Sequence, residues 1–444
     1  MKRFGILAFC WIMASPLLGA TGKGDVKEFK LKNGMKVLIL KDDSIPNANM
    51  YTFWKVGSRN ELPGITGLSH FFEHMMFNGS KNYPPGSFDT VMEAAGGSNN
   101  AYTSNDVTVY TNWFPTSAFS TIVNLEADRI ASLQLDDKKI ESERGVVLSE
   151  RSTGLENDPW EELGIVVRST AFLAHPYSWP VIGWEPDIKA WTKADLQRYF
   201  DTYYNPANAV MVIVGAVDPA AIIKELQNKI EPISRPFEVP ELRTVEPEQK
   251  GERRVWVLKP TITNPHFMAA YHIPAGNHAD HFALDLLSVI LTDGPSSRLY
   301  KALVDEQRIA LEVGAGNSDG LDPDLFTFMI VGAEGKKPSA IEKAFDKEIA
   351  LLQAKGVTAR ELEKAKNKRL VGMYRALETI NGKAQLLGNF EVFFGGYQNL
   401  FTAPDAYKAV NVADIQRVLT TYFQPRNRTL GILDQRQESG KDKE

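Results

Sequence analysis

The sequence carries its strongest pattern in the stretch Gly67-Leu68-Ser69-His70-Phe71-Phe72-Glu73-His74-Met75-Met76-Phe77. If this stretch is a helix, His70 and His74 lie one turn apart on one face, where two imidazoles can bind one metal ion. Glu73 lies slightly off that face, so its carboxylate can act on a water molecule at the metal without being a ligand. Two nitrogen donors, a carboxylate base and apolar neighbours are typical of hydrolytic metal sites. The stretch therefore predicts a metal-dependent hydrolase.

The sequence around this helix indicates a mixture of strands and helices. Apolar or alternating runs typical of strands occur at residues 36–40, 49–54, 108–114 and 210–214. Helical spacing occurs at residues 66–77, 119–133, 136–151 and 193–203. Strands interleaved with helices predict the α+β fold class, with a mixed, mostly antiparallel sheet and helices packed on one face.

The chain repeats one arrangement in its two halves. Residues 195–208 hold Asp-Leu-Gln-Arg and then Thr-Tyr-Tyr-Asn-Pro-Ala-Asn, and residues 414–427 hold Asp-Ile-Gln-Arg and then Thr-Tyr-Phe-Gln-Pro-Arg-Asn. An apolar run typical of a strand follows each copy. The constant spacing predicts an internal duplication. The alternative is a common helix–turn–strand element that occurs twice, but polar and turn residues match as well as apolar ones.

We therefore expect two duplicated α/β-roll domains separated by a proline-rich linker. Together with the chain ends, the expected parts are a signal peptide at 1–20, a first domain at 25–230, a linker at 231–252, a second, inactive domain at 253–434 and a disordered tail at 435–444.

The first twenty residues have the pattern of a secretory signal peptide. Lys2 and Arg3 supply the positive end, and the apolar run that follows is short and contains Pro16, which argues against a membrane-spanning helix. The only cysteine, Cys10, lies in this segment, so the mature chain would have no thiol ligand, thiolate nucleophile or disulfide. We expect a periplasmic protein without stable membrane insertion; full secretion is the alternative.

Composition narrows the class of protein. A chain of 444 residues with 43% hydrophobic residues is globular and long enough for two domains or more. Its net charge of −5 argues against a nucleic-acid partner, because phosphate binding requires a basic surface.

Two histidines leave the metal site incomplete, because a catalytic zinc site usually has three protein ligands and a water molecule. Without cysteine, the third ligand must be His, Asp or Glu. The predicted helix at 136–151 offers Glu143 and Glu150, seven residues apart and therefore on one face. On counting alone, each of the remaining histidines is also possible as the third ligand: His175, His266, His272, His278 and His281. Chemistry alone leaves the choice among these residues open.

The order His70-x-x-Glu73-His74, followed after about 75 residues by Glu150, resembles the inverted-zincin peptidases of the pitrilysin (M16) family. Further stretches that resemble the family are residues 74–80, 96–103, 143–147 and 175–177. Length and duplication resemble the short-chain branch, which includes mitochondrial processing peptidase and its bacterial relatives. The resemblance covers nearly all of the mature chain and is most specific in the first half.

The resemblance implies a zinc-dependent endopeptidase or oligopeptidase. It implies that His70, His74 and Glu150 bind one zinc ion per chain. It also implies that Glu73 activates the water and that Glu143 is an acidic neighbour that supports the site. A chance His-x-x-Glu-His string and a solvated face for the two helical acids are the alternatives without function, and the other matching stretches disfavour both.

The resemblance further implies that Asn100, Ala101 and Tyr102 lie on an edge strand that binds the substrate backbone. Strand addition holds an extended peptide by main-chain hydrogen bonds and so gives weak sequence preference. Turn formation next to Gly96-Gly97 is the alternative for Asn100. The expected substrates are unfolded peptides in an enclosed chamber.

The second half departs from the family pattern. Active single-chain members usually present an arginine and a tyrosine, seven residues apart, that hold the substrate near the zinc. The alignment of the Ser-Arg-Leu-Tyr run at 297–300 puts Val304 and Leu311 in those places. Neither side chain can donate a hydrogen bond to a peptide carbonyl or an oxyanion. In the two-chain branch of the family a partner subunit supplies this pair, so we expect the zinc-bearing subunit of a heterodimer, one half of a clamshell.

Three other interpretations remain open. The chain would be an active homodimer if Arg298 or Arg308 replaced the missing arginine. It would be a structural or binding subunit if it kept the fold without catalysis, although the complete zinc motif argues against this. A metal-storage or metal-sensing role fits poorly with a single site beside a carboxylate base.

Overall fold

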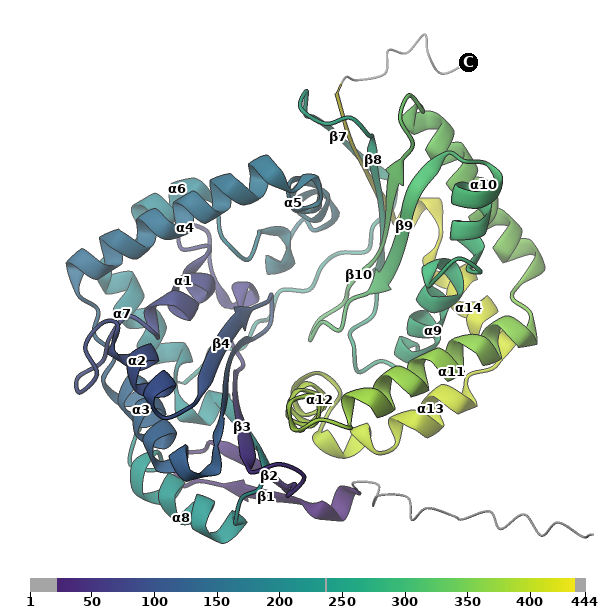
Figure 1. Cartoon of the computed structure of the whole chain (residues 1–444). Helices are drawn as coiled ribbons and strands as arrows, with labels where there is room; N and C mark the ends of the chain where they lie inside the picture. The colour runs from purple at the N-terminus through teal and green to yellow at the C-terminus, as the bar shows by residue number, and fades with distance from the viewer. Residues whose placement is uncertain (1–21, 236–237, 436–444) are drawn as a thin grey trace, which may run out of the picture.

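A computed structural model describes residues 22–235 and 238–435 and shows an α+β fold built on two sheets (Figure 1). The predicted signal peptide and the predicted tail, apart from Gln435, lie outside the described residues. In the part of the chain that is described, no helix has both the length and the hydropathy needed to cross a membrane.

The first sheet has six strands in the order β1-β2-β6-β3-β5-β4. Their bounds are β1 Val26–Lys30, β2 Lys36–Lys41, β3 Asn47–Trp54, β4 Ser98–Thr103, β5 Thr108–Pro115 and β6 Ala209–Gly215. Only the β2–β6 pair is parallel, so the sheet is mixed and mostly antiparallel, as predicted. This order places β4 at one edge.

The second sheet has five strands in the order β7-β11-β8-β10-β9. Their bounds are β7 Arg253–Leu258, β8 His266–Ile273, β9 Ala310–Asn317, β10 Asp324–Gly332 and β11 Arg428–Asp434. Here β11 is parallel to β7 and antiparallel to β8, just as β6 is parallel to β2 and antiparallel to β3. The two copies of the repeated motif thus end in strands at equivalent places, which confirms the predicted duplication of the fold.

Helices divide between the two sheets (Figure 1). The first half contributes α1 Leu68–Met75, α2 Ser87–Ala94, α3 Phe119–Ser132, α4 Asp137–Asn157, α5 Pro159–Ala171, α6 Glu185–Ala190, α7 Lys193–Tyr203 and α8 Pro219–Lys229. The second half, from β7 to β11, contributes α9 His281–Thr292, a π-helix at Tyr300–Glu306, α10 Pro338–Lys355, α11 Ala359–Ala376, α12 Ile380–Phe393, α13 Ala403–Ala409 and α14 Val412–Tyr422. The segment 231–252, where it is described, contains neither helix nor strand.

Central strands are buried on both faces, which explains their almost continuous apolar sequence. In β6, Met211 and Ile213 point to the core beneath α1, α3 and α7, while Val210 and Val212 point to the opposite face. The side-chain period of two along a strand assigns alternate residues to the two faces.

One helix from the opposite half covers the second face of each sheet. The second-half helix α12 packs on β3 and β6 of the first sheet, where Leu387 lies in one cluster with Phe53 and Val212. Conversely, α5 packs on β7, β8 and β11, where Val167 lies with Met268. In Figure 1, α5 lies on the side of the first half that faces the second sheet, and α12 lies on the side of the second half that faces the first sheet. The sequence predicted helices on one face; the structure confirms these and adds an exchanged helix on the other face.

Candidate metal centre

The helix α1 begins at a position that only glycine suits. Gly67 caps its N-terminus at φ +88°, and a Cβ atom there would lie 2.5 Å from the backbone oxygen of Ile182. Leu68, Phe71 and Phe72 bury the opposite side of α1 in the core of the first half. The amphipathic pattern therefore leaves the histidines and Glu73 on the side that is not buried in the core.

The helix α4 presents two acids to α1. Its start is capped by Asp136, whose carboxylate accepts hydrogen bonds from the backbone of Lys138 and Lys139. The guanidinium of Arg144 donates to the backbone oxygens of Ile188 and Trp191, which anchors α4 to the segment at α6. One anchored helix face thus holds both Glu143 and Glu150.

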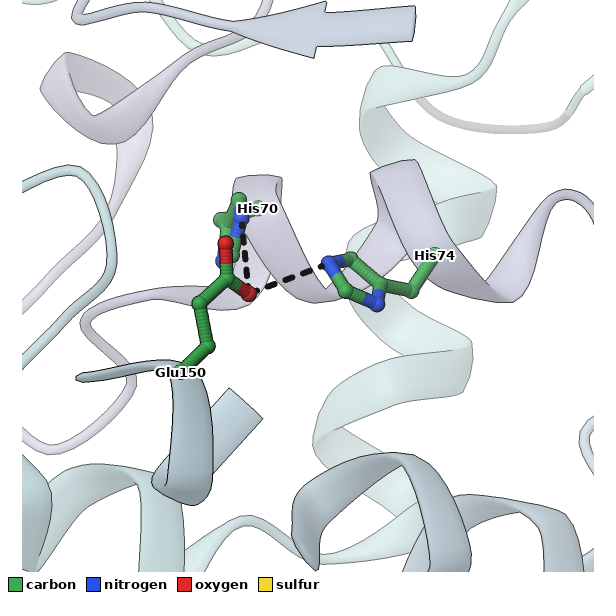
Figure 2. A group of neighbouring side chains, drawn as sticks. All are labelled: His70, His74 and Glu150. Carbon is green, nitrogen blue, oxygen red and sulfur yellow. Dashed lines mark ion pairs between the residues drawn. The ribbon is translucent and has the colours of Figure 1, made fainter. Parts of the chain in front are cut away.

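The structure brings His70, His74 and Glu150 together. In Figure 2 the Glu150 carboxylate of α4 faces the two imidazoles of α1. Glu150 Oε2 lies 3.8 Å from His70 Nε2 and 3.6 Å from His74 Nε2. All three donor atoms lie within 4.8 Å of one another, and in the described residues this is the one group of three such side chains. On the other side of the ring, His74 Nδ1 lies 3.4 Å from Glu143 Oε2.

Burial shifts the pKa values of His70 and Glu73, in each case in favour of the uncharged form. Burial lowers the pKa of His70 to about 4, and the neighbouring His74 acts in the same direction. A neutral imidazole has the free lone pair that a metal requires. Burial also raises the pKa of Glu73, although the hydroxyl of Thr103, 2.6 Å from Glu73 Oε2, opposes that shift by donating a hydrogen bond.

Two hollows meet at this group of side chains. A cavity of about 360 Å³ is lined by His70, Thr103, Glu150 and the apolar Ile165 and Ile182. An open groove of about 1010 Å³ on the other side is lined by His74, Glu150 and the α4 residues Val146 and Ser149. Glu150 and Ile182 line both hollows.

The segment at residues 100–102 lies on the edge strand β4. Asn100 and Tyr102 are exposed, and Ala101 is half-buried against the core of the first half. The Tyr102 hydroxyl accepts a hydrogen bond of 2.8 Å from Gln385 Nε2 of the exchanged helix α12. Since β4 pairs only with β5 in the sheet, its outer edge offers backbone groups for a further strand.

The other histidines lie away from this group. His175 is buried and contacts Asp322 at 3.2 Å, and His272 contacts the backbone oxygen of Ala171 at 3.0 Å. His266, His278 and His281 belong to the second half. Of the candidates that chemistry left open, Glu150 is the one whose carboxylate lies within 4 Å of both histidines, whereas Glu143 lies beside His74 alone.

The residues that occupy the places of the missing arginine and tyrosine lie in the second half. The two arginines considered as replacements lie there too. Val304 packs against its core, and Leu311 is 52% exposed on the edge strand β9. Arg298 donates to both carboxylate oxygens of Glu361. Arg308 is exposed and adopts φ 51°, in the left-handed region. Among the described residues, the guanidinium of Arg308 has no bidentate carboxylate partner, unlike that of Arg298.

Two contributors to the site were not predicted. Glu61 is buried, and its carboxylate accepts hydrogen bonds of 2.7 Å from the backbone of both Gly67 and Ser69, at the start of α1. Burial raises the pKa of Glu61 to about 8. Thr103 contacts Glu73 from the end of β4. The contacts of Glu61 are with residues six and eight positions further along the chain, whereas the contact of Thr103 with Glu73 depends on tertiary structure.

Two family models match the chain. The model described as "Insulinase (Peptidase family M16)" matches residues 36–183, and the model described as "Peptidase M16 inactive domain" matches residues 190–369. The first match includes α1, β4 and α4. These three elements carry the candidate metal ligands, the candidate base Glu73 and the edge-strand residues 100–102.

Individual proteins match over almost their whole length. The chain is 32% identical to zinc protease PqqE of Helicobacter pylori, with 91% of both chains covered. It is 22% identical to the uncharacterized zinc protease YmxG of Bacillus subtilis, over 90% of this chain and 96% of the relative. The crystal structure of a protease from Helicobacter pylori superimposes with a TM-score of 0.89 at 30% identity, covering 92% of this chain and 99% of that one.

Proposed function

Because this chain belongs to the M16 family of peptidases, we propose that it is a zinc-dependent peptidase with His70, His74 and Glu150 as metal ligands. The observation that carries the proposal is the donor geometry. Two ligands of a tetrahedral zinc ion lie about 3.3–3.6 Å apart. The distances of 3.6 and 3.8 Å from Glu150 Oε2 to the histidine nitrogens are close to this value.

The side chains divide the chemistry among them. Bound zinc supplies Lewis-acid activation of water and of the scissile carbonyl. Glu73 takes a proton from the attacking water as the new carbon–oxygen bond forms, and it delivers a proton to the leaving nitrogen as the carbon–nitrogen bond breaks. Glu143, 3.4 Å from His74 Nδ1, orients that imidazole.

The substrate is an extended, unfolded peptide. Its backbone pairs with the free edge of β4 at Asn100, Ala101 and Tyr102, and it crosses the two hollows that meet at Glu150. Main-chain hydrogen bonds hold many sequences equally well, so the two hollows are the sites of any side-chain preference.

A partner subunit completes the site. Val304 packs against the core and Leu311 is apolar, so these positions supply no donor for the developing oxyanion. We infer that a homologous partner closes a chamber over the site and brings an arginine and a tyrosine. The signal-peptide pattern and the absence of cysteine after Cys10 support a periplasmic location for this assembly.

Substitution Glu73→Gln tests the proposed function. The amide cannot take the proton, so cleavage of an unfolded peptide falls below detection, while the zinc content stays at one ion per chain because the ligands are unchanged. The assay uses the protein isolated with its native partners, and zinc is measured by elemental analysis. The matched control is Glu93→Gln, an exposed acid of α2, which retains full activity.

Two results would contradict the proposal. Peptide cleavage by the Glu73→Gln variant at the wild-type rate would exclude this residue as the base. A wild-type protein that holds no zinc after dialysis against zinc and then metal-free buffer would exclude the ligand set.

A further inference from the structure

The residue Thr103 connects the edge strand to the carboxylate of Glu73. It is the last residue of β4, and its Oγ1 lies 2.6 Å from Glu73 Oε2. Along β4 the odd-numbered residues are half-buried and the even-numbered ones are exposed, so Thr103 faces the same side as Ala101. The strand β4, whose outer edge is open to a peptide, thus ends at a residue that contacts the Glu73 carboxylate of α1.

Two acceptors lie near the hydroxyl of Thr103, and the Glu73 carboxylate is the nearer one. Thr108 Oγ1 lies 3.5 Å from Thr103 Oγ1 and donates its own proton to the backbone oxygen of Val56 at 3.0 Å. An ionised carboxylate can only accept, so the single hydroxyl proton of Thr103 is donated to Glu73. The β-branched side chain has restricted χ1 freedom on a strand, which keeps the hydroxyl in place.

We propose that Thr103 is a positioning residue for the peptidase reaction. Its hydroxyl holds Oε2 of Glu73 and leaves Oε1 free to take the proton from water. Because Thr103 belongs to β4, the bound peptide and the carboxylate keep one relative position through the reaction. A hydrogen bond to a charged group is among the stronger ones in proteins, and its loss costs about 10- to 100-fold in an equilibrium or rate.

The role of Thr103 rests on the proposed function. Its test compares three variants. Thr103→Val keeps size and β-branching but removes the hydroxyl, Thr103→Ser keeps the hydroxyl, and Thr52→Val is the matched control. Thr52 is a buried threonine of β3 whose hydroxyl has no hydrogen-bond partner among the described residues. Peptide cleavage is measured with the native assembly, zinc affinity by competition with a chelating dye, and the Glu73 conformation in crystals of each metal-free variant.

We expect Thr103→Val to lower kcat about 10- to 100-fold with unchanged KM and unchanged zinc affinity. In its crystals the Glu73 carboxylate leaves its place beside residue 103. Thr103→Ser recovers most of kcat, and Thr52→Val matches the wild type in every measurement.

The proposal is overturned if Thr103→Val keeps both the wild-type kcat and the wild-type Glu73 conformation. It is also overturned if zinc affinity falls and Thr103→Ser does not restore activity, since that result indicates a structural role. A wild-type assembly that cleaves no peptide would instead reject the proposed function, and the crystallographic comparison would still test the contact between Thr103 and Glu73.

Discussion

At the scale of single residues, burial sets the charge state of His70. Its side chain is only 13% exposed, and the cost of burying a charge lowers the pKa of the imidazole to about 4. In the unfolded chain the same group titrates near 6.5. Between these two values the unfolded state binds a proton that the folded state does not, so folding stability falls as the pH falls through this window.

This shift predicts a pH dependence of stability in the metal-free protein. From pH 7.5 to pH 5 the wild type should lose about 2 kcal/mol of unfolding free energy relative to His70→Gln, which lacks the titrating group. Urea unfolding of both proteins at the two pH values, with a chelator present, measures the difference. Parallel pH dependence of the two proteins would contradict the assigned shift.

At the scale of elements, α12 depends on one very close contact. A Cβ atom at Gly388 would lie 2.0 Å from Cε2 of Phe53, so the helix approaches β3 more closely than any other residue type permits. Leu387 and Ala384 bury the neighbouring surface against the same sheet. The exchanged helix is therefore held by close packing and by apolar burial.

Substitution Gly388→Ala should weaken this packing. The added methyl group displaces Phe53, and overpacking of this kind costs about 1–3 kcal/mol, which lowers the melting temperature. The matched control is Gly372→Ala in α11, where a Cβ atom meets nothing within 4 Å. There the better helix propensity of alanine should stabilise by about 0.5–1 kcal/mol. Calorimetry of the two variants should thus give shifts of opposite sign, and equal shifts would refute the packing argument.

At the scale of the whole molecule, the two halves contribute unequally to the candidate site. Every side chain of the metal group comes from the first half, whereas the second half contributes α12, whose Gln385 contacts the edge strand at Tyr102. The positions expected to hold the arginine and tyrosine are Val304 and Leu311. The first half therefore supplies the whole metal group, while Val304 and Leu311 of the second half supply no donor for an oxyanion.

This asymmetry predicts that the purified chain alone cleaves peptides at least about 100-fold more slowly than the chain with its partner, because loss of an oxyanion donor costs about 10²–10³ in rate. Pull-down of the native protein followed by peptide cleavage with and without the captured partner measures this ratio. Full activity of the isolated chain would reject the heterodimer. Substitution of Arg308 by alanine would then test whether a homodimer uses that residue instead.

The sequence by itself determined the fold class, the duplication and the peptidase family. Each depends on local patterns: the period of two in strands such as β6, the helical spacing of His70 and His74, and the repeated motif before β6 and β11. The roles of His70, His74 and Glu150 as ligands, of Glu73 and Glu143 in catalysis and of residues 100–102 in substrate binding stay predictions, as do the domain boundaries.

Only the tertiary structure decided which distant groups meet. It placed Glu150, from among the open candidates, beside the two histidines, brought Thr103 to Glu73, and exchanged α5 and α12 between the halves. Periodicity reports which side of an element is apolar, because that depends on neighbouring residues. It does not report what covers that side, because the covering residues are far away in sequence and their contact depends on how the whole chain packs.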